Sequence, residues 1–99
     1  MGRFLVHESR ASKSLLLDVQ SDLLDHLNTR VVVPLMLESD APIPANRLNP
    51  TFIINDVKYI MVTQFMATVP VSMLKNAVCD LTESSDEITN AVDFLTTGF

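Results

Sequence analysis

The side chains that most often perform chemistry are few in this sequence and stand far apart. The two histidines, His7 and His26, have no nucleophile in a recognised elbow motif beside them, and the single cysteine, Cys79, stands among apolar neighbours. Nucleophilic catalysis needs a nucleophile, a base and an orienting group that converge. We therefore expect no catalytic residue, both histidines on the surface or satisfied in loops, and Cys79 as a buried structural thiol.

Metal and phosphate sites are equally poorly supported. One cysteine and two isolated histidines lack the spacing of metal ligands. The two glycines, Gly2 and Gly98, cannot build a glycine-rich phosphate loop. Asp18, Asp22 and Asp25 stand close together, but a solvated loop with a turn-forming aspartate is the more ordinary explanation. We expect no metal and no cofactor.

The charge of the chain argues against direct nucleic-acid binding. The net charge is −5, and the seven lysines and arginines are scattered along the sequence. Proteins that read nucleic acids usually cluster their cations on one face. A protein partner is therefore the better expectation.

The size of the chain indicates one domain, residues 1–99, with an apolar content of 47% that is sufficient for a packed core. A core this small has a narrow stability margin, and dimerisation would add buried area. One unpaired cysteine fits a reducing compartment. No targeting segment or membrane span is visible, so we expect a soluble cytoplasmic protein.

Short apolar and β-branched runs predict strands along most of the chain. The expected strands are Phe4–Val6, Leu15–Val19, Arg30–Leu37, Thr51–Ile54, Val57–Thr63 and Gln64–Val69. Asn55 and Asp56 tolerate the left-handed region and predict a tight hairpin turn. Pro34 and Pro70 lack an amide donor and each predict a bulge or a sheet edge. Residues 20–28 fit one helical turn or an irregular loop, residues 38–47 fit a loop, and residues 71–78 fit either strand or helix.

The last part of the chain has the clearest helical pattern. Ser84 and Glu87 have the spacing of a capping box. One apolar stripe follows at helical spacing: Ile88, Ala91, Val92 and Leu95. Gly98 predicts the left-handed residue that ends the helix. Phe99 then either packs back onto the core or faces a partner. The pattern as a whole predicts a mostly β fold, a small barrel or two antiparallel sheets, with one C-terminal α-helix.

Five stretches, in order and at matching spacing, resemble the CcdB toxin family. They are Asp18–Asp25, Arg30–Leu35, Leu48–Pro50, Ala67–Val71 and Asn90–Phe99. The resemblance covers essentially the whole chain and is weakest at residues 36–47. It implies an SH3-like barrel with a C-terminal helix, assembled as a two-fold homodimer.

The resemblance also implies a function. Proteins of this family are toxins of type II toxin–antitoxin modules that bind the DNA gyrase A subunit and trap gyrase on cleaved DNA, until a CcdA-like antitoxin frees the enzyme. They are not enzymes themselves. The residues that match the family's gyrase-binding positions are Leu23, Leu24, Asp93, Thr97, Gly98 and Phe99.

One of these positions departs from the family. The best-known members carry a tryptophan, which stacks on a gyrase arginine, where this chain has Thr97. Threonine cannot stack, so the departure supports an alternative, a non-toxic homologue that only binds antitoxin. A further alternative is an endoribonuclease like the MazF toxins, which share this barrel. The acidic charge argues against that activity because RNA binding favours a basic face.

Overall fold

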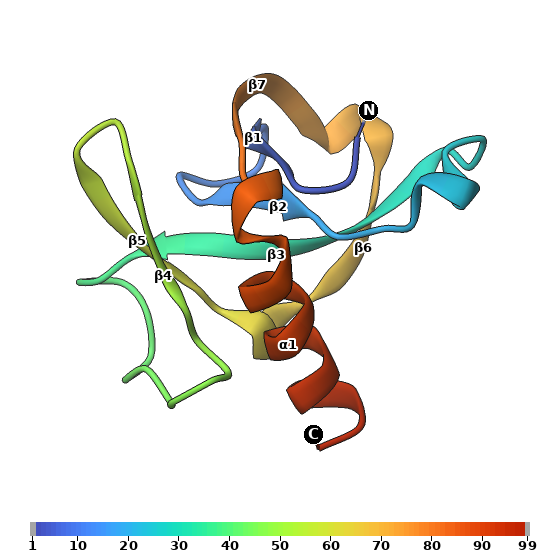
Figure 1. The fold of residues 1–99 in the computed structure, drawn as a ribbon. Helices are drawn as coiled ribbons and strands as arrows, with labels where there is room; N and C mark the ends of the chain where they lie inside the picture. Colours follow the sequence, from blue (N-terminus) through green and yellow to red (C-terminus); the bar gives the residue numbers. More distant parts are fainter. Residues whose placement is uncertain (1, 99) are drawn as a thin grey trace.

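The computed structural model describes residues 2–98, and this part of the chain is mostly β with one C-terminal helix (Figure 1). The strands are β1 Leu5–Ser9, β2 Leu15–Asp18, β3 Thr29–Leu37, β4 Thr51–Ile54, β5 Val57–Met61, β6 Ala67–Pro70 and β7 Leu74–Asp80. Short 3₁₀ turns lie at Asp22–Leu24, Thr63–Phe65, Val71–Met73 and Thr82–Ser84. The helix α1 spans Ser85–Thr96. The predicted fold class is confirmed.

The strands form one curled antiparallel sheet in the order β4-β5-β3-β2-β1-β7, and β6 also pairs with β3. β3 is the central strand because its two ends have different partners on one side, β6 at residues 29–32 and β5 at residues 35–37. Pro34 lies at this change of partner, where a missing amide donor breaks no ladder bond. On the other side, β3 pairs with β2 in continuous register through Pro34, which lies opposite Leu16. The expectation of a bulge or a sheet edge at Pro34 was therefore wrong.

The main core lies between the sheet and α1. Its fully buried members include Val6, Leu17, Val33 and Met61 from the sheet, with Ile88 from the helix. A smaller cluster lies apart from it. Its buried members are Leu16, Val32 and Leu74, with half-buried Val69 and Met73 packed against them. Alternate residues of β2 and β3 thus contribute to different clusters, as the period of a strand requires.

The β4–β5 hairpin forms as predicted. Asn55 and Asp56 have φ angles of 51° and 65°, the left-handed conformation that a tight two-residue hairpin turn needs. Phe52 and Ile54 face the core, whereas Ile53 is exposed. The turn residues therefore fix a register that sends alternate side chains inward.

Two local expectations were wrong. Residues 63–65 form a 3₁₀ turn instead of continuing the strand, and β6 begins only at Ala67. Ser84 makes no side-chain cap, because it is already the last residue of a 3₁₀ turn. Asp80 caps that turn instead, accepting hydrogen bonds from the Thr82 amide and hydroxyl at 2.8 and 2.5 Å. These bonds, the hydroxyl one first, lower the pKa of Asp80.

The first strand differs from expectation, and two segments that the sequence left open are now assigned. β1 extends into the expected loop and ends at Ser9, with register irregularities against β7. Residues 71–78, which fitted strand or helix, divide into a short turn and the first part of β7. Residues 20–28 contain a single 3₁₀ turn, which confirms that expectation. In the described part of the chain, no helix has the length and apolar character to cross a membrane.

Candidate functional site

The C-terminal end of α1 is built to project from the body of the protein. The predicted apolar stripe buries Ile88 and Ala91, but Val92 is only half-buried and Leu95 is 39% exposed. In Figure 1 the helix crosses in front of the middle strands, and its last turns run past the sheet. The helix therefore buries a narrow stripe in its middle, at Ile88 and Ala91, and leaves its last turn largely on the surface.

Three predicted site residues lie on this exposed end. The carbonyl oxygen of Asp93 accepts bonds from the amides of Thr97 and Gly98 at 2.7 and 3.2 Å. The Thr97 hydroxyl donates to the same oxygen at 2.7 Å. Gly98 has a φ of 81°, which confirms the left-handed residue expected there. Phe99, the last predicted site residue, lies outside the described residues.

Asp93 occupies an electrostatically unfavourable position. It lies in the last turn of α1, where the helix dipole is negative and no basic residue is present. Its side chain is exposed, and no hydrogen bond or ion pair to that carboxylate occurs within residues 2–98. An exposed carboxylate that destabilises its helix and has no polar partner within residues 2–98 is a candidate contact for another molecule.

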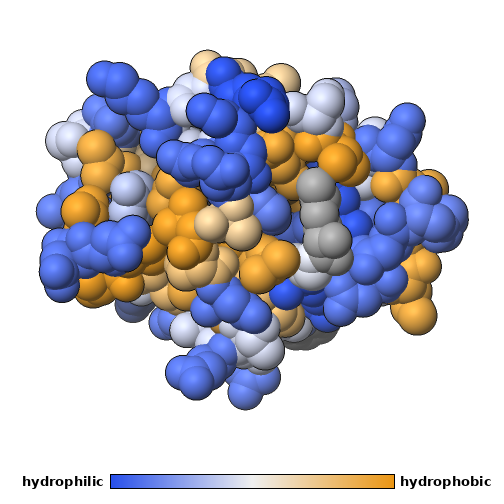
Figure 2. Space-filling view, turned by 90° about the horizontal axis from the view of Figure 1, so that it is seen from above, coloured by the Kyte–Doolittle hydropathy of each residue, from blue (hydrophilic) through white to orange (hydrophobic). Residues whose placement is uncertain are grey.

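Leu23 and Leu24 form a second exposed feature on the segment between β2 and β3, residues 21–28, here named the docking loop. Leu23 is 88% exposed and Leu24 is 43% exposed. The docking loop projects from the body at the right of Figure 1, and Figure 2 shows apolar side chains projecting on the same side. Leu27, which the sequence analysis did not select, is 41% exposed on the same loop. Three exposed leucines on one short loop make it a candidate protein-contact surface.

The base of the docking loop contains a buried ion pair that the sequence analysis did not anticipate. Asp18 is completely buried and accepts two bonds from Arg30, at 2.8 and 3.0 Å. Asp25 accepts a third bond from Arg30 at 2.6 Å. The expectation of a solvated acidic loop was wrong for Asp18. Burial acts to lower the pKa of Arg30, but the bonds to Asp18 and Asp25 outweigh it and hold that pKa above its ordinary value.

The docking loop and the helix end are not brought together within one chain. Figure 1 places the loop at the upper right, at the ends of β2 and β3, and the end of α1 at the bottom. Leu23 and Leu24 therefore form one exposed patch, and Asp93, Thr97 and Gly98 form another. A partner that touches both patches of one protomer must span much of its surface.

Groups able to perform covalent chemistry do not converge in the described residues. His7 is buried in β1 rather than on the surface, with Nδ1 3.2 Å from the carbonyl oxygen of Lys75 and Nε2 without a partner among residues 2–98. His26 is exposed. Cys79 is half-buried rather than fully buried, and burial followed by the charge of Asp80 raises its pKa. No group of three or more metal-ligating side chains occurs within residues 2–98.

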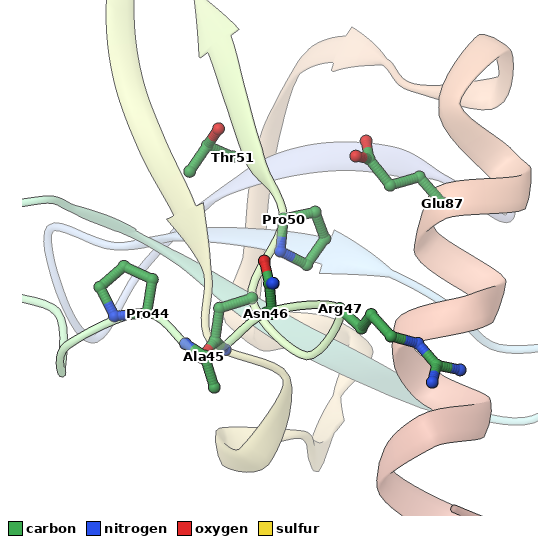
Figure 3. A pocket seen from close by; sticks show the side chains of 8 residues that line it. Pro44, Ala45, Asn46, Arg47, Pro50, Thr51 and Glu87 are labelled. Atoms are coloured by element: carbon green, nitrogen blue, oxygen red, sulfur yellow. The ribbon is translucent and has the colours of Figure 1, made fainter. Parts of the chain in front are cut away.

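An open hollow of about 280 Å³ lies between the loop before β4 and the first turn of α1 (Figure 3). Its lining residues are Pro44, Ala45, Asn46, Arg47, Asn49, Pro50, Thr51 and Glu87. The Arg47 guanidinium stacks on the Phe94 ring at 4.6 Å and so joins this loop to the helix. Asn49 is buried and bonded to Ala45, Met61 and Gln64. Asn49 and Arg47 thus hold the loop in place.

Comparison with known proteins identifies the family. The family model described as "CcdB protein" matches residues 3–98, nearly the whole chain. The chain belongs to the CcdB family. The recognition from sequence is confirmed, and membership makes this protein a toxin of the toxin–antitoxin type.

A solved structure supports the fold independently. The chain is similar to the Mycobacterium tuberculosis toxin MazF-mt6, with a TM-score of 0.74 and 13% sequence identity. The match covers 90% of this chain and 92% of that protein. At this identity the likeness establishes the curled sheet with its helix and carries nothing about activity.

Proposed function

We propose that this CcdB-family protein binds the DNA gyrase A subunit, traps gyrase on cleaved DNA, and is neutralised by a CcdA-like antitoxin. The observation that carries the proposal is the exposed end of α1, where Asp93, Thr97 and Gly98 occupy the positions that resemble the family's gyrase contacts. Leu23 and Leu24, exposed on the docking loop, add a second apolar contact. The target places the protein in the cytoplasm.

A homodimer would suit this target. A two-fold toxin can place the same patch twice against the two-fold gyrase A dimer, so that each contact counts twice. Contacts at the centre of an interface carry most of its binding energy. A pair of projecting helix ends near a two-fold axis would supply such a centre.

The proposed contact differs in chemistry from that of the best-known family members. The Thr97 hydroxyl is bonded to the Asp93 carbonyl and closes the end of the helix, so it offers a partner no stacking surface. A stacked guanidinium contributes about 1–2 kcal/mol when it is desolvated. We propose that the aliphatic side chains of the docking loop and the residues after Thr97 supply the apolar contact instead.

The test is a gyrase cleavage assay with purified protein, gyrase, supercoiled DNA and ATP, in which linear DNA is the product measured. The wild type should accumulate linear DNA, and a variant lacking residues 97–99 should not, while its circular dichroism stays unchanged. Leu23→Ser should also reduce the linear product. Ile43→Ser is the matched control, since Ile43 is 94% exposed on a different loop.

Two results would contradict the proposal. A folded truncated protein that still traps gyrase would show that the helix end is not the contact. A folded wild type that yields no linear DNA would favour the non-toxic homologue, especially if it binds antitoxin and leaves growth normal when overexpressed.

An endoribonuclease is the second candidate, because the fold resembles that of a MazF toxin. The charges do not favour it. Arg30 is buried against Asp18, Lys58 is paired with Glu38 at 2.9 Å, and the net charge of −5 leaves no excess of cations for an RNA-binding face. Incubation of the purified protein with RNA tests this activity. Cleavage that disappears on substitution of Arg30, in a variant that still folds, would support it.

A further inference from the structure

We propose that Asp25 and Arg30 form a clamp that positions the docking loop for its partner, with Gln20 as a second tie. The inference rests on the proposed function, in which Leu23 and Leu24 contact gyrase. The clamp residues themselves need not touch the partner. They act by holding the loop in one conformation.

The docking loop cannot hold itself by apolar packing. None of the residues of its 3₁₀ turn is buried, and Leu23, the most apolar part of its tip, is 88% exposed. A free loop with two exposed leucines would tend to fold them onto the nearest apolar surface, because burial of apolar area is favourable. Something other than the leucines therefore keeps this loop extended into solvent.

The charge balance of the clamp indicates that Asp25 serves the loop and is not needed to neutralise Arg30. Arg30 Nε and Nη2 bind the two carboxylate oxygens of Asp18, so this buried pair is already neutral and geometrically complete. Asp25 adds a second carboxylate, 2.6 Å from Arg30 Nη1 and 45% exposed. The core does not need this extra charge. Its evident effect is to attach the docking loop, directly after its 3₁₀ turn, to a fixed point in the sheet.

Gln20 attaches the middle of the same loop. Its amide Nε2 donates to the Leu24 carbonyl at 3.0 Å, and its Oε1 accepts from the Val31 amide at 3.0 Å. The side chain is buried and therefore stays in place. Through it, the backbone at Leu24 is bonded to β3. Two independent side chains thus bind the docking loop to the same strand.

A loop held in one conformation binds more tightly because less ordering free energy is lost on binding. When only a fraction of molecules has the competent loop, the apparent affinity falls by that fraction. Asp25→Ala removes one hydrogen bond to a charged group. A loss of that kind changes the equilibrium between the competent loop and its other conformations by about tenfold. We therefore expect about a tenfold weaker affinity for gyrase when Asp25 is removed.

The experiment compares wild type, Asp25→Ala, Asp25→Asn and Asp40→Ala. Asp40→Ala is the matched control, because it removes one exposed carboxylate that makes no ion pair within residues 2–98. Asp25→Asn keeps a neutral acceptor for Arg30 and serves as the second variant if Asp25→Ala does not fold. Amide hydrogen exchange is measured residue by residue, and affinity is measured by titration with purified gyrase A subunit.

In Asp25→Ala we expect faster exchange at the amides of Leu24, Asp25 and Leu27, unchanged exchange in the core strands, and weaker gyrase binding. Asp25→Asn should give an intermediate loss, and Asp40→Ala should behave as wild type. Unchanged loop exchange in Asp25→Ala would overturn the clamp. Faster loop exchange with unchanged gyrase affinity would overturn its positioning role. A wild type that binds no gyrase would refute the proposed function, while the exchange data would still decide whether Asp25 holds the loop.

Discussion

At the scale of single residues, Asp93 is the clearest case of a side chain whose position destabilises the fold. It lies in the last turn of α1, next to the negative end of the helix dipole. Asp93→Asn should therefore raise the free energy of unfolding by about 0.3–1 kcal/mol. The same variant should trap less gyrase, because the exposed carboxylate is lost from the proposed contact. Urea unfolding and the cleavage assay measure the two effects.

Asp86→Asn is the control for this prediction. Asp86 lies in the first turn of the same helix, where the dipole favours a negative charge. Its substitution should lower stability and leave gyrase trapping unchanged. If both variants changed stability in the same direction, the dipole explanation would be refuted.

The buried pair at the base of the docking loop predicts a large effect at one residue. Asp18→Asn removes the fully buried carboxylate that binds two nitrogens of Arg30 and leaves this buried guanidinium with only the half-exposed Asp25 as its ionic partner. Loss of one partner from a buried pair costs up to about 3–5 kcal/mol, because the remaining buried charge is less well compensated. Urea unfolding should show this loss, with Asp40→Asn as a control of the same chemistry on the surface. A loss below about 1 kcal/mol, the range of exposed pairs, would contradict the burial of the pair.

The thiol of Cys79 should react slowly at neutral pH. Burial and the charge of Asp80 raise its pKa, so the reactive thiolate is scarcer than in an unperturbed cysteine. Alkylation by iodoacetamide should be slow at pH 7 and accelerate only well into the alkaline range. The same protein unfolded in urea supplies the reference, because its thiol has the ordinary pKa. Equal rate profiles in the two states would disprove the raised pKa.

At the scale of elements, local signals were predictable and pairings were not. Asn55-Asp56 and Gly98 identified their turns because a left-handed backbone strongly restricts the residue types that adopt it. Pro34 was misread because its place depends on which strand lies opposite, and β5 and β6 are distant in sequence. Ser84 was misread because a 3₁₀ turn at Thr82–Ser84 leads directly into α1, so Ser84 lacks the extended backbone of an N-cap residue. Nothing in the local sequence pattern distinguishes such a turn from a capping box.

The turn of the β4–β5 hairpin predicts a substitution that makes the protein more stable. Asp56 holds a φ of 65°, which glycine adopts without the strain that a side chain brings. Asn-Gly is the favoured pair for this turn. Asp56→Gly should therefore raise the free energy of unfolding by about 0.5–1 kcal/mol, as measured in urea. Asp40→Gly, which changes a loop without that positive φ, should give no such gain, and a loss at Asp56 would contradict the turn assignment.

At the scale of the whole molecule, the candidate site came from family resemblance and its layout came from the structure. The sequence order of Leu23, Asp93 and Thr97 does not say that the docking loop and the end of α1 lie apart in the fold (Figure 1). The Asp18–Arg30–Asp25 cluster was also hidden, since a carboxylate near a turn looks the same whether it is solvated or buried. The distances between these charged groups depend on how β2 and β3 pair, which the sequence pattern does not specify.

The proposed homodimer predicts that stability depends on protein concentration. A chain of 99 residues buries a limited core, and its second apolar cluster leaves Val69 and Met73 half-covered. If two copies bury further apolar area, mass action ties folding to association, so the thermal midpoint should rise as the protein is concentrated. Scanning calorimetry over a hundredfold concentration range, with light scattering for the mass, measures both. The variant lacking residues 97–99 should show the same dependence, because its missing tail is assigned to gyrase and not to the second copy. A midpoint independent of concentration, together with a mass of 11.0 kDa, would exclude the dimer and with it the two-fold match to gyrase.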